Sequence, residues 1–107
     1  MEITLTTPFQ INWTDSLTGQ TEQKTITKLE VAYIQLDYKR QAIILASTYK
    51  DNEGFRASSN HSAFGDKAVN PFIDGTGYAT LEAAGVNQSE VYSYLQGQHG
   101  FLAGTVS

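Results

Sequence analysis

The sequence predicts an α+β domain built on an antiparallel β-meander of three or more strands, with two short helices at its C-terminal end. Two long runs of β-branched and aromatic residues flank a short charged tip, and a third such run precedes them. Good helix formers and capping residues gather after residue 79. At 107 residues the chain has the usual size of one hydrophobic core, so we expect a single domain over residues 1–107.

The first expected strand covers residues 3–13. Its apolar side chains stand at odd-numbered positions from Ile3 to Trp13, which places them on one face of a strand and in the core. Pro8 stands on the opposite face and has no N–H to donate to a neighbouring strand. We therefore expect this strand to lie at an edge or to be broken at Pro8. Residues 15–20 have the composition of a turn.

A long hairpin is expected next, with strands at residues 24–38 and 41–50 and Lys39-Arg40 at its exposed tip. In the first of these strands the apolar residues change from odd to even positions near Tyr33. Either a β-bulge near Tyr33 or burial of the strand on both faces would explain the change, and we favour burial on both faces. The continuous apolar run of residues 42–46 favours the same interpretation for the second strand.

After the hairpin the chain becomes polar and then helical. Residues 58–76 are mostly small and polar, which predicts a long loop that is mobile in the free protein and orders against a partner. Two short helices follow, the first at residues 80–84 and the second capped by Asn87. The tail, residues 101–106, is apolar enough to pack as an extended segment. Three strands are few for a stable sheet, so a strand added by the tail or by a neighbouring copy would help.

Composition excludes several classes of function. The formal net charge of −4 argues against a nucleic-acid partner, because affinity for phosphate backbones needs clustered Lys and Arg. The N-terminal sequence has neither the basic start nor the apolar run of a secretory signal, and no stretch is long and apolar enough to span a membrane. We therefore expect synthesis in the cytoplasm without a signal peptide, and no membrane partner. The chain contains no cysteine and cannot form disulfides.

No constellation of residues predicts chemistry. His61 lies in a Ser- and Asn-rich segment and His99 between glycines, and neither has carboxylates or cysteines at metal-ligand spacing. Glycine-rich phosphate-binding loops are absent. We expect no catalytic activity, no cofactor, no metal and no small-molecule substrate.

Two binding functions remain as alternatives. Residues 81–95 resemble the turn and second helix of a helix-turn-helix DNA-binding motif, and the resemblance implies that Gln88 and Ser89 would face base edges. That helix carries no Lys or Arg, which argues against DNA. The residues at matching positions are Gly85, Val86, Asn87, Val91 and Leu95. A small carbohydrate-binding module is the other alternative, with Trp13, Tyr33 and Tyr49 as an aromatic platform.

The apolar run in the hairpin favours protein–protein contact. Residues 42–46 offer apolar side chains to both faces of their strand, yet two short helices can cover only one face of a small sheet. An uncovered apolar face usually marks an interface, so we expect a homo-oligomer or a bound state. The candidate interface residues are Tyr33, Ile43, Ile44, Leu45, Tyr49 and Phe64.

The whole pattern is similar to that of the small accessory structural proteins of tailed-bacteriophage particles. The similarity lies in an acidic, cysteine-free, lightly charged chain with a long hairpin at residues 29–49, a Gly/Ser/Asn-rich loop and a short helical end. It implies a non-catalytic structural or adaptor role in a multi-copy assembly, here a virion. The implied partners are other copies of the chain and neighbouring assembly proteins.

Overall fold

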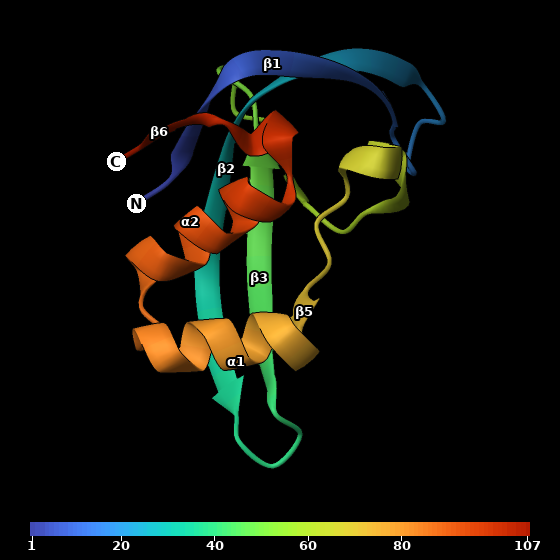
Figure 1. The fold of residues 1–107 in the computed structure, drawn as a ribbon. Coiled ribbons are helices and arrows are strands. Elements are labelled where there is room, and N and C mark those ends of the chain that lie inside the picture. The colour runs from blue at the N-terminus through green and yellow to red at the C-terminus, as the bar shows by residue number, and fades with distance from the viewer.

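The computed structural model describes residues 1–107, and it contains an antiparallel sheet of six strands with helices packed on one face (Figure 1). The strand order is β4-β3-β2-β1-β6, and β5 pairs with β3 on the side that also carries β4. The expected α+β class and the antiparallel sheet are therefore confirmed. The elements are β1 (Ile3–Thr14), β2 (Thr21–Asp37), β3 (Ala42–Lys50), β4 (Arg56–Ser58), the 3-10 helix η1 (Ser62–Lys67), β5 (Phe72–Ile73), α1 (Gly75–Ala84), α2 (Gln88–Gln98), the 3-10 helix η2 (Gly100–Leu102) and β6 (Gly104–Val106).

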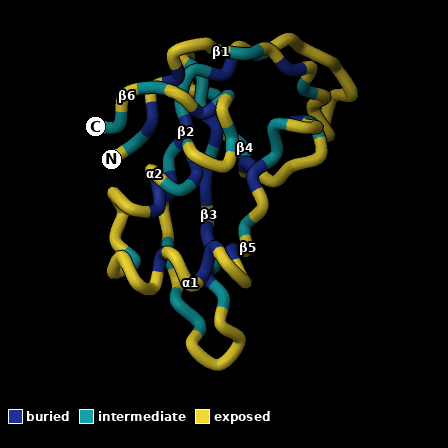
Figure 2. The backbone as a smooth tube through the Cα atoms, in the orientation of Figure 1, coloured by how far each residue is buried: buried dark blue, intermediate teal, exposed yellow.

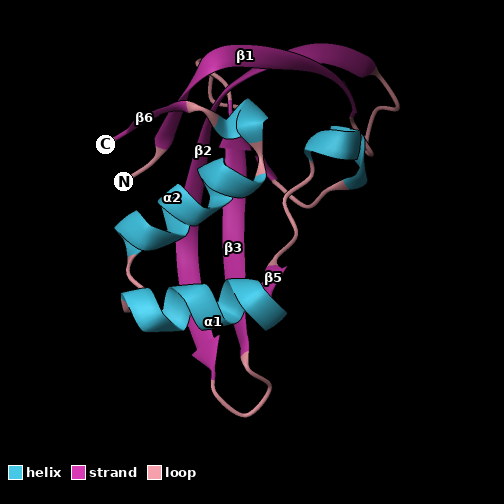
Figure 3. Ribbon diagram, in the orientation of Figure 1, coloured by secondary structure: helices cyan, strands magenta, loops and turns pink.

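The hairpin of β2 and β3 forms the long axis of the molecule. Asp37 pairs with Ala42, so the chain turns at residues 38–41 and Lys39 and Arg40 are exposed at the tip, as the sequence predicts. Figure 3 shows α1 and α2 lying across these two strands, side by side on the same face of the sheet. The structure therefore has two layers over most of its length.

A β-bulge in β2 explains the change of phase near Tyr33. Val31 pairs with Ser47 and Tyr33 pairs with Ala46, so β2 has one extra residue, Ala32, between these pairs. The bulge returns the apolar side chains after it to the face that carries those before it. Our preference for burial of β2 on both faces is therefore wrong, and the bulge is the correct alternative. The apolar residues that share the helix-covered face of β2 are Leu29, Val31, Ile34 and Leu36.

β3 alternates in the same way. Ile43, Leu45 and Tyr49 are buried under the helices, whereas Ile44 is only partly buried and Ala46 is exposed on the opposite face. The expectation that β3 is buried on both faces is therefore wrong for the single chain. The normal strand period of two is present in β3 but cannot be seen in the sequence of residues 42–46, because the outward positions there are apolar too.

β1 is one strand, but its pairing with β2 is interrupted at Pro8, where the sequence predicts either an edge strand or a break. Thr4 pairs with Lys28 and Phe9 with Ile26, so residues 5–8, including Pro8, lie opposite a single residue of β2. The first part of β1 also pairs with β6, so the C-terminal tail adds a strand, as expected. The second part arches over the end of β3 (Figure 1).

The first helix is longer than the sequence predicts. α1 begins at Gly75, whereas the glycines at 75 and 77 suggested a turn. Gly77 serves close packing instead, because a Cβ at this position would lie 2.8 Å from Ile73 Cγ2 and would also overlap the hydroxyl of Tyr94. The second helix is capped as expected, since the side chain of Asn87 accepts a hydrogen bond of 3.0 Å from the backbone N–H of Glu90.

The segment expected as a long polar loop, residues 58–76, contains η1, β5 and the start of α1. Phe64, Val69 and Ile73 are buried and fix it to the core. The prediction of a long loop is therefore wrong. The segment is mostly polar, but a few buried apolar side chains are enough to hold short elements against the core.

The core lies between the sheet and the helices, and Figure 2 shows the buried residues running along β3 beneath α1 and α2. Ile3, Leu5 and Ile11 are buried there, as the first strand's alternation predicts. Trp13 is only half-buried, and its ring packs against Phe55 and His61 at centroid distances of 5.1 and 4.6 Å. Its placement as a full core residue is therefore wrong.

Candidate protein-interaction surface

The most unusual surface is the sheet face opposite the helices, which we call the uncovered face. In an antiparallel sheet with one solvated side, the outward positions are normally polar. In the middle of this face, four outward positions of β2, β3 and β5 instead carry two aromatic side chains, an isoleucine and an alanine. We call this group, Tyr33, Ile44, Ala46 and Phe72, the apolar patch.

The apolar patch is contiguous because its members are cross-strand neighbours. Tyr33 is paired with Ala46, and Phe72 is paired with Ile44, one outward position further along β3. Tyr33 is 49% exposed and Phe72 is 54% exposed, so both rings stand in solvent in the single chain. The Tyr33 hydroxyl donates to the side-chain oxygen of Gln35, which lies beside it on the same face.

A group of five charged residues, the charged band, occupies the other end of the uncovered face. The Lys50 ammonium lies 3.0 Å from a Glu30 carboxylate oxygen and 3.3 Å from one of Glu2. Lys28 reaches Glu2 at 3.4 Å, and Arg56 reaches Glu30 at 3.6 Å. The charged band is thus an ion-pair network with one more positive than negative charge.

The network changes the acidity of its members. Burial disfavours the ionised form of Glu2, but hydrogen bonds and attraction from Lys50 and Lys28 outweigh it and lower the pKa of that carboxyl. The hydrogen bond to Glu30 raises the pKa of the Lys50 ammonium. These side chains are partly exposed, so the network contributes little to stability.

Only two of the six candidate interface residues lie on the uncovered face. Tyr33 and Ile44 belong to the apolar patch. The other four are buried, each at most 3% exposed: Ile43, Leu45, Tyr49 and Phe64. The first three point inward because every second residue of β3 does, and Phe64 points into the core from η1. In the single chain these four therefore offer no surface to a partner.

Phe72 is the interface candidate that sequence reasoning missed. It lies in the segment expected as a loop, and its partner strand could not be predicted without the β3–β5 pairing. The side-chain oxygen of Asn70 accepts a hydrogen bond of 2.9 Å from the backbone N–H of Phe72, and this bond fixes the turn before β5. The Asn70-Pro71 turn signal was the one available indication of an ordered segment.

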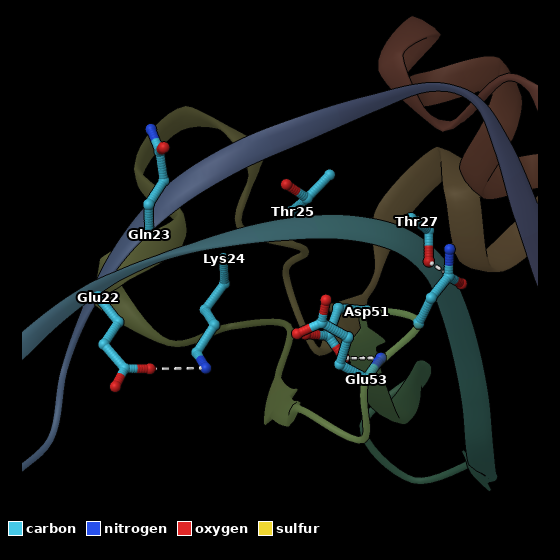
Figure 4. A pocket seen from close by; sticks show the side chains of 8 residues that line it. Glu22, Gln23, Lys24, Thr25, Thr27, Asp51 and Glu53 are labelled. Atoms are coloured by element: carbon cyan, nitrogen blue, oxygen red, sulfur yellow. Dashed lines mark hydrogen bonds and ion pairs between the residues drawn. The ribbon is translucent and has the colours of Figure 1, made fainter.

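A polar groove lies between the first half of β2 and the β3–β4 turn, with a volume of about 280 Å³. Figure 4 shows Glu22 and Lys24 of β2 pointing toward each other, and their ion pair is 2.9 Å long. Asp51 is occupied by its own turn, since its carboxylate accepts hydrogen bonds from the backbone N–H groups of Glu53 and Phe55, both at 2.8 Å. Three of the four charged residues that line the groove, Glu22, Lys24 and Asp51, therefore already have partners within the chain.

The segment that resembles a helix-turn-helix motif forms a helical hairpin on the sheet. α1 runs across the strands and α2 returns beside it (Figure 1), with Gly85, Val86 and Asn87 between them. The helices of a DNA-binding motif cross at about 90–120°, so that the second one projects from the domain. Gln88 and Ser89 are exposed at the start of α2, but its inner side, including Val91 and Leu95, is buried in the core.

The structure does not bring the three aromatic residues of the carbohydrate alternative together. Tyr49 is fully buried in the core, and its hydroxyl donates to the backbone oxygen of Lys67 at 2.6 Å. Tyr33 lies on the uncovered face, and Trp13 packs against Phe55. The three rings occupy three separate environments and form no platform.

The histidines have structural contacts. His61 Nδ1 accepts a hydrogen bond of 3.0 Å from the backbone N–H of Ala63 and so caps η1. The ring of His99 lies 5.3 Å from that of Phe101. Side chains of His, Asp and Glu nowhere gather in a group of three that could hold a metal ion. Neither α1 nor α2 has the length and apolar composition that crossing a membrane requires.

The chain matches no known protein-family model, no curated protein and no solved structure.

Proposed function

We propose that this chain is a non-catalytic structural or adaptor protein of a multi-copy assembly, and that it makes its contacts through the uncovered face. The observation that carries the proposal is the apolar patch in the middle of a solvated sheet. Single exposed apolar residues are ordinary, but a contiguous group on one face is typical of an interaction site. Exposed aromatic residues are also the type that interface centres favour.

A bacteriophage particle is the setting that we propose for this assembly. The support for it is the similarity of the sequence pattern to small accessory virion proteins. In such a particle the chain would contact other copies of itself and neighbouring structural proteins, without a cofactor.

Mass spectrometry of purified particles from the source tests the proposal. We expect the chain to be present in several copies per particle, in the purified fraction and not only in the lysate. A Tyr33→Lys/Phe72→Lys variant should be made and folded normally but left out of the particles, because two charges replace the exposed rings.

A Leu17→Lys variant is the matched control, since Leu17 is 94% exposed in the β1–β2 turn and outside the uncovered face. It should enter particles like the parent chain. Absence of the chain from particles, or strongly salt-dependent binding to DNA, would contradict the proposal.

A further inference from the structure

The edges of the sheet beside β3 and beside the first residues of β1 are closed to another strand. The outer side of β3 is occupied by β4 and β5, and between them Leu45 N–H donates to the Pro71 carbonyl at 2.7 Å. At the other edge, Gln96 Nε2 donates to the carbonyls of Leu102 and Gly104, both at 3.1 Å, beside the short β6. Covered and short edges disfavour edge-to-edge pairing. Around the apolar patch, the free surface is therefore the uncovered face.

We infer that a second copy of the chain covers the uncovered face in a twofold, face-to-face dimer, with the strands of the two copies antiparallel and the axis passing near Ala46. The inference rests on the proposed function, which makes this face the contact surface. Ala46 is the middle residue of the nine in β3 and is exposed, so the axis at this point overlays the whole strand. Stacked sheets with nearly aligned strands are a common packing.

The strand pairings fix which residues would meet. Each strand of one copy lies over the same strand of the other copy, in the opposite direction; we call such a stacked pair a column. A residue some distance from Ala46 toward Lys50 in one copy therefore faces the residue at the same distance toward Ala42 in the other copy. Ile44 and Thr48 lie two residues from Ala46 in opposite directions, and they pair with Phe72 of β5 and Ser58 of β4 respectively. Phe72 of one copy therefore meets Ser58 of the other. A large ring therefore faces a small exposed side chain, which is the arrangement that allows two surfaces to interlock.

Charges of opposite sign meet at the ends of the same overlay. Lys28 pairs with Lys50 and Asp37 pairs with Ala42, so Lys28 of one copy faces Asp37 of the other in the β2 column.

The neighbouring column behaves in the same way. Arg56 pairs with Lys50, and Asp74 follows Ile73, the partner of Ile43, in extended conformation. Arg56 of one copy therefore faces Asp74 of the other. Stacked sheets lie about 10 Å apart, which a long basic side chain and a short acidic one together span. The extra positive charge of the charged band thus meets two carboxylates.

The size of the face suits a weak but specific dimer. It is roughly 30 Å long over β3 and roughly 15–20 Å wide across the neighbouring strands. Two such faces bury roughly 900–1,200 Å², at or just below the lower limit of stable specific interfaces. We expect dissociation in the micromolar range, as for other small interfaces, so the dimer should be visible in concentrated solution.

Sedimentation equilibrium of the full chain at increasing concentration tests the inference. We expect a monomer–dimer equilibrium, and an Ala46→Arg variant should raise the dissociation constant at least about 100-fold by placing like charges at the axis. Leu17→Lys is the control and should leave the equilibrium unchanged. Both positions are exposed in the single chain, so both variants should fold.

A charge exchange tests the register. Arg56→Asp alone should weaken the dimer about 5- to 50-fold, and adding Asp74→Arg should restore it to within a few-fold of the parent. Loss of the ion pair between Arg56 and Glu30 cannot produce that rescue. A dimer unaffected by Ala46→Arg, or a charge exchange without rescue, would overturn the proposed packing.

A parent chain that stays monomeric at several hundred micromolar would overturn the dimer itself. If such a monomer is nevertheless found in particles, the assembly role stands and the second copy is the wrong partner. If instead the dimer forms as described but the chain is absent from particles, the assembly role fails and the dimer stands.

Discussion

The backbone N–H of Val31 donates a hydrogen bond of 2.8 Å to the hydroxyl of Tyr92, sixty-one residues away in the sequence. The bulge in β2 begins at Val31, where the pairing with β3 is interrupted. The same hydroxyl donates to the carbonyl of Met1 at 2.7 Å. One side chain of α2 therefore connects the bulge, the N-terminus and the helical layer.

We expect Tyr92→Phe to lower the free energy of unfolding by about 1–3 kcal/mol, because it leaves the buried N–H of Val31 without an acceptor. Urea unfolding followed by circular dichroism would measure the change. Tyr33→Phe is the matched control, since that hydroxyl is exposed and contacts only Gln35; its effect should stay within about 0.5 kcal/mol. Equal effects of the two variants would show that the Val31 N–H has another hydrogen-bond acceptor.

Ile43 and Ile44 are neighbours on opposite faces of β3 and should respond differently to truncation. Ile43 is fully buried, so Ile43→Ala should cost about 2–5 kcal/mol through lost contacts and a cavity. Ile44→Ala removes a partly exposed side chain and should cost about 1 kcal/mol in dilute solution. Chemical denaturation of both variants, compared at equal concentration, distinguishes them; a larger loss at Ile44 would contradict the assignment of faces.

Two helical glycines should give changes of opposite sign. Gly77→Ala should lower the free energy of unfolding by about 1–3 kcal/mol, because the new methyl group would meet Ile73 and Tyr94. Gly97→Ala, in α2 with open space around it, should raise it by about 0.5–1 kcal/mol through helix propensity. Thermal unfolding of the pair would detect both signs.

Stability should fall at alkaline pH. Burial raises the pKa of the Tyr49 and Tyr92 hydroxyls above the ordinary phenol value near 10. The contribution of each neutral, buried phenol is fully present below about pH 10 and is lost as the pH rises toward its folded-state pKa.

In that window each such tyrosine lowers the free energy of unfolding by about 1.4 kcal/mol per pH unit. Urea unfolding at several pH values between 8 and 12 would show a steepening loss. Tyr49→Phe should reduce the slope, because its phenol is the more strongly shifted of the two. A parent and a variant with the same slope would contradict the assignment.

The hairpin could be predicted from sequence because its signal is local. Two β-rich runs and the charged pair Lys39-Arg40 specify strands and turn without reference to the rest of the chain. The helix cap at Asn87 and the break at Pro8 were predictable for the same reason, since each depends on the chemistry of one residue.

Features that depend on distant contacts could not be predicted. The change of apolar positions near Tyr33 had two possible explanations in the sequence. The residue that accepts the free N–H of Val31 at the bulge, Tyr92, lies in another element. The start of α1 was hidden because Gly77 suggests a turn until its contact with Tyr94 is known. Burial of Ile43 rather than Ile44 depends on which face the helices cover, which the apolar run itself does not reveal.

The pairing of Ile3 with Val106 has a consequence for the order of folding. Hairpins such as that of β2 and β3 form in about 1–10 μs, whereas contacts between distant parts of a chain form slowly. The tail strand should therefore dock last, and until it docks the outer side of β1 at Ile3 is open to pairing with other chains. Pulse-labelled amide exchange during refolding should accordingly protect the hairpin well before Thr105 becomes protected.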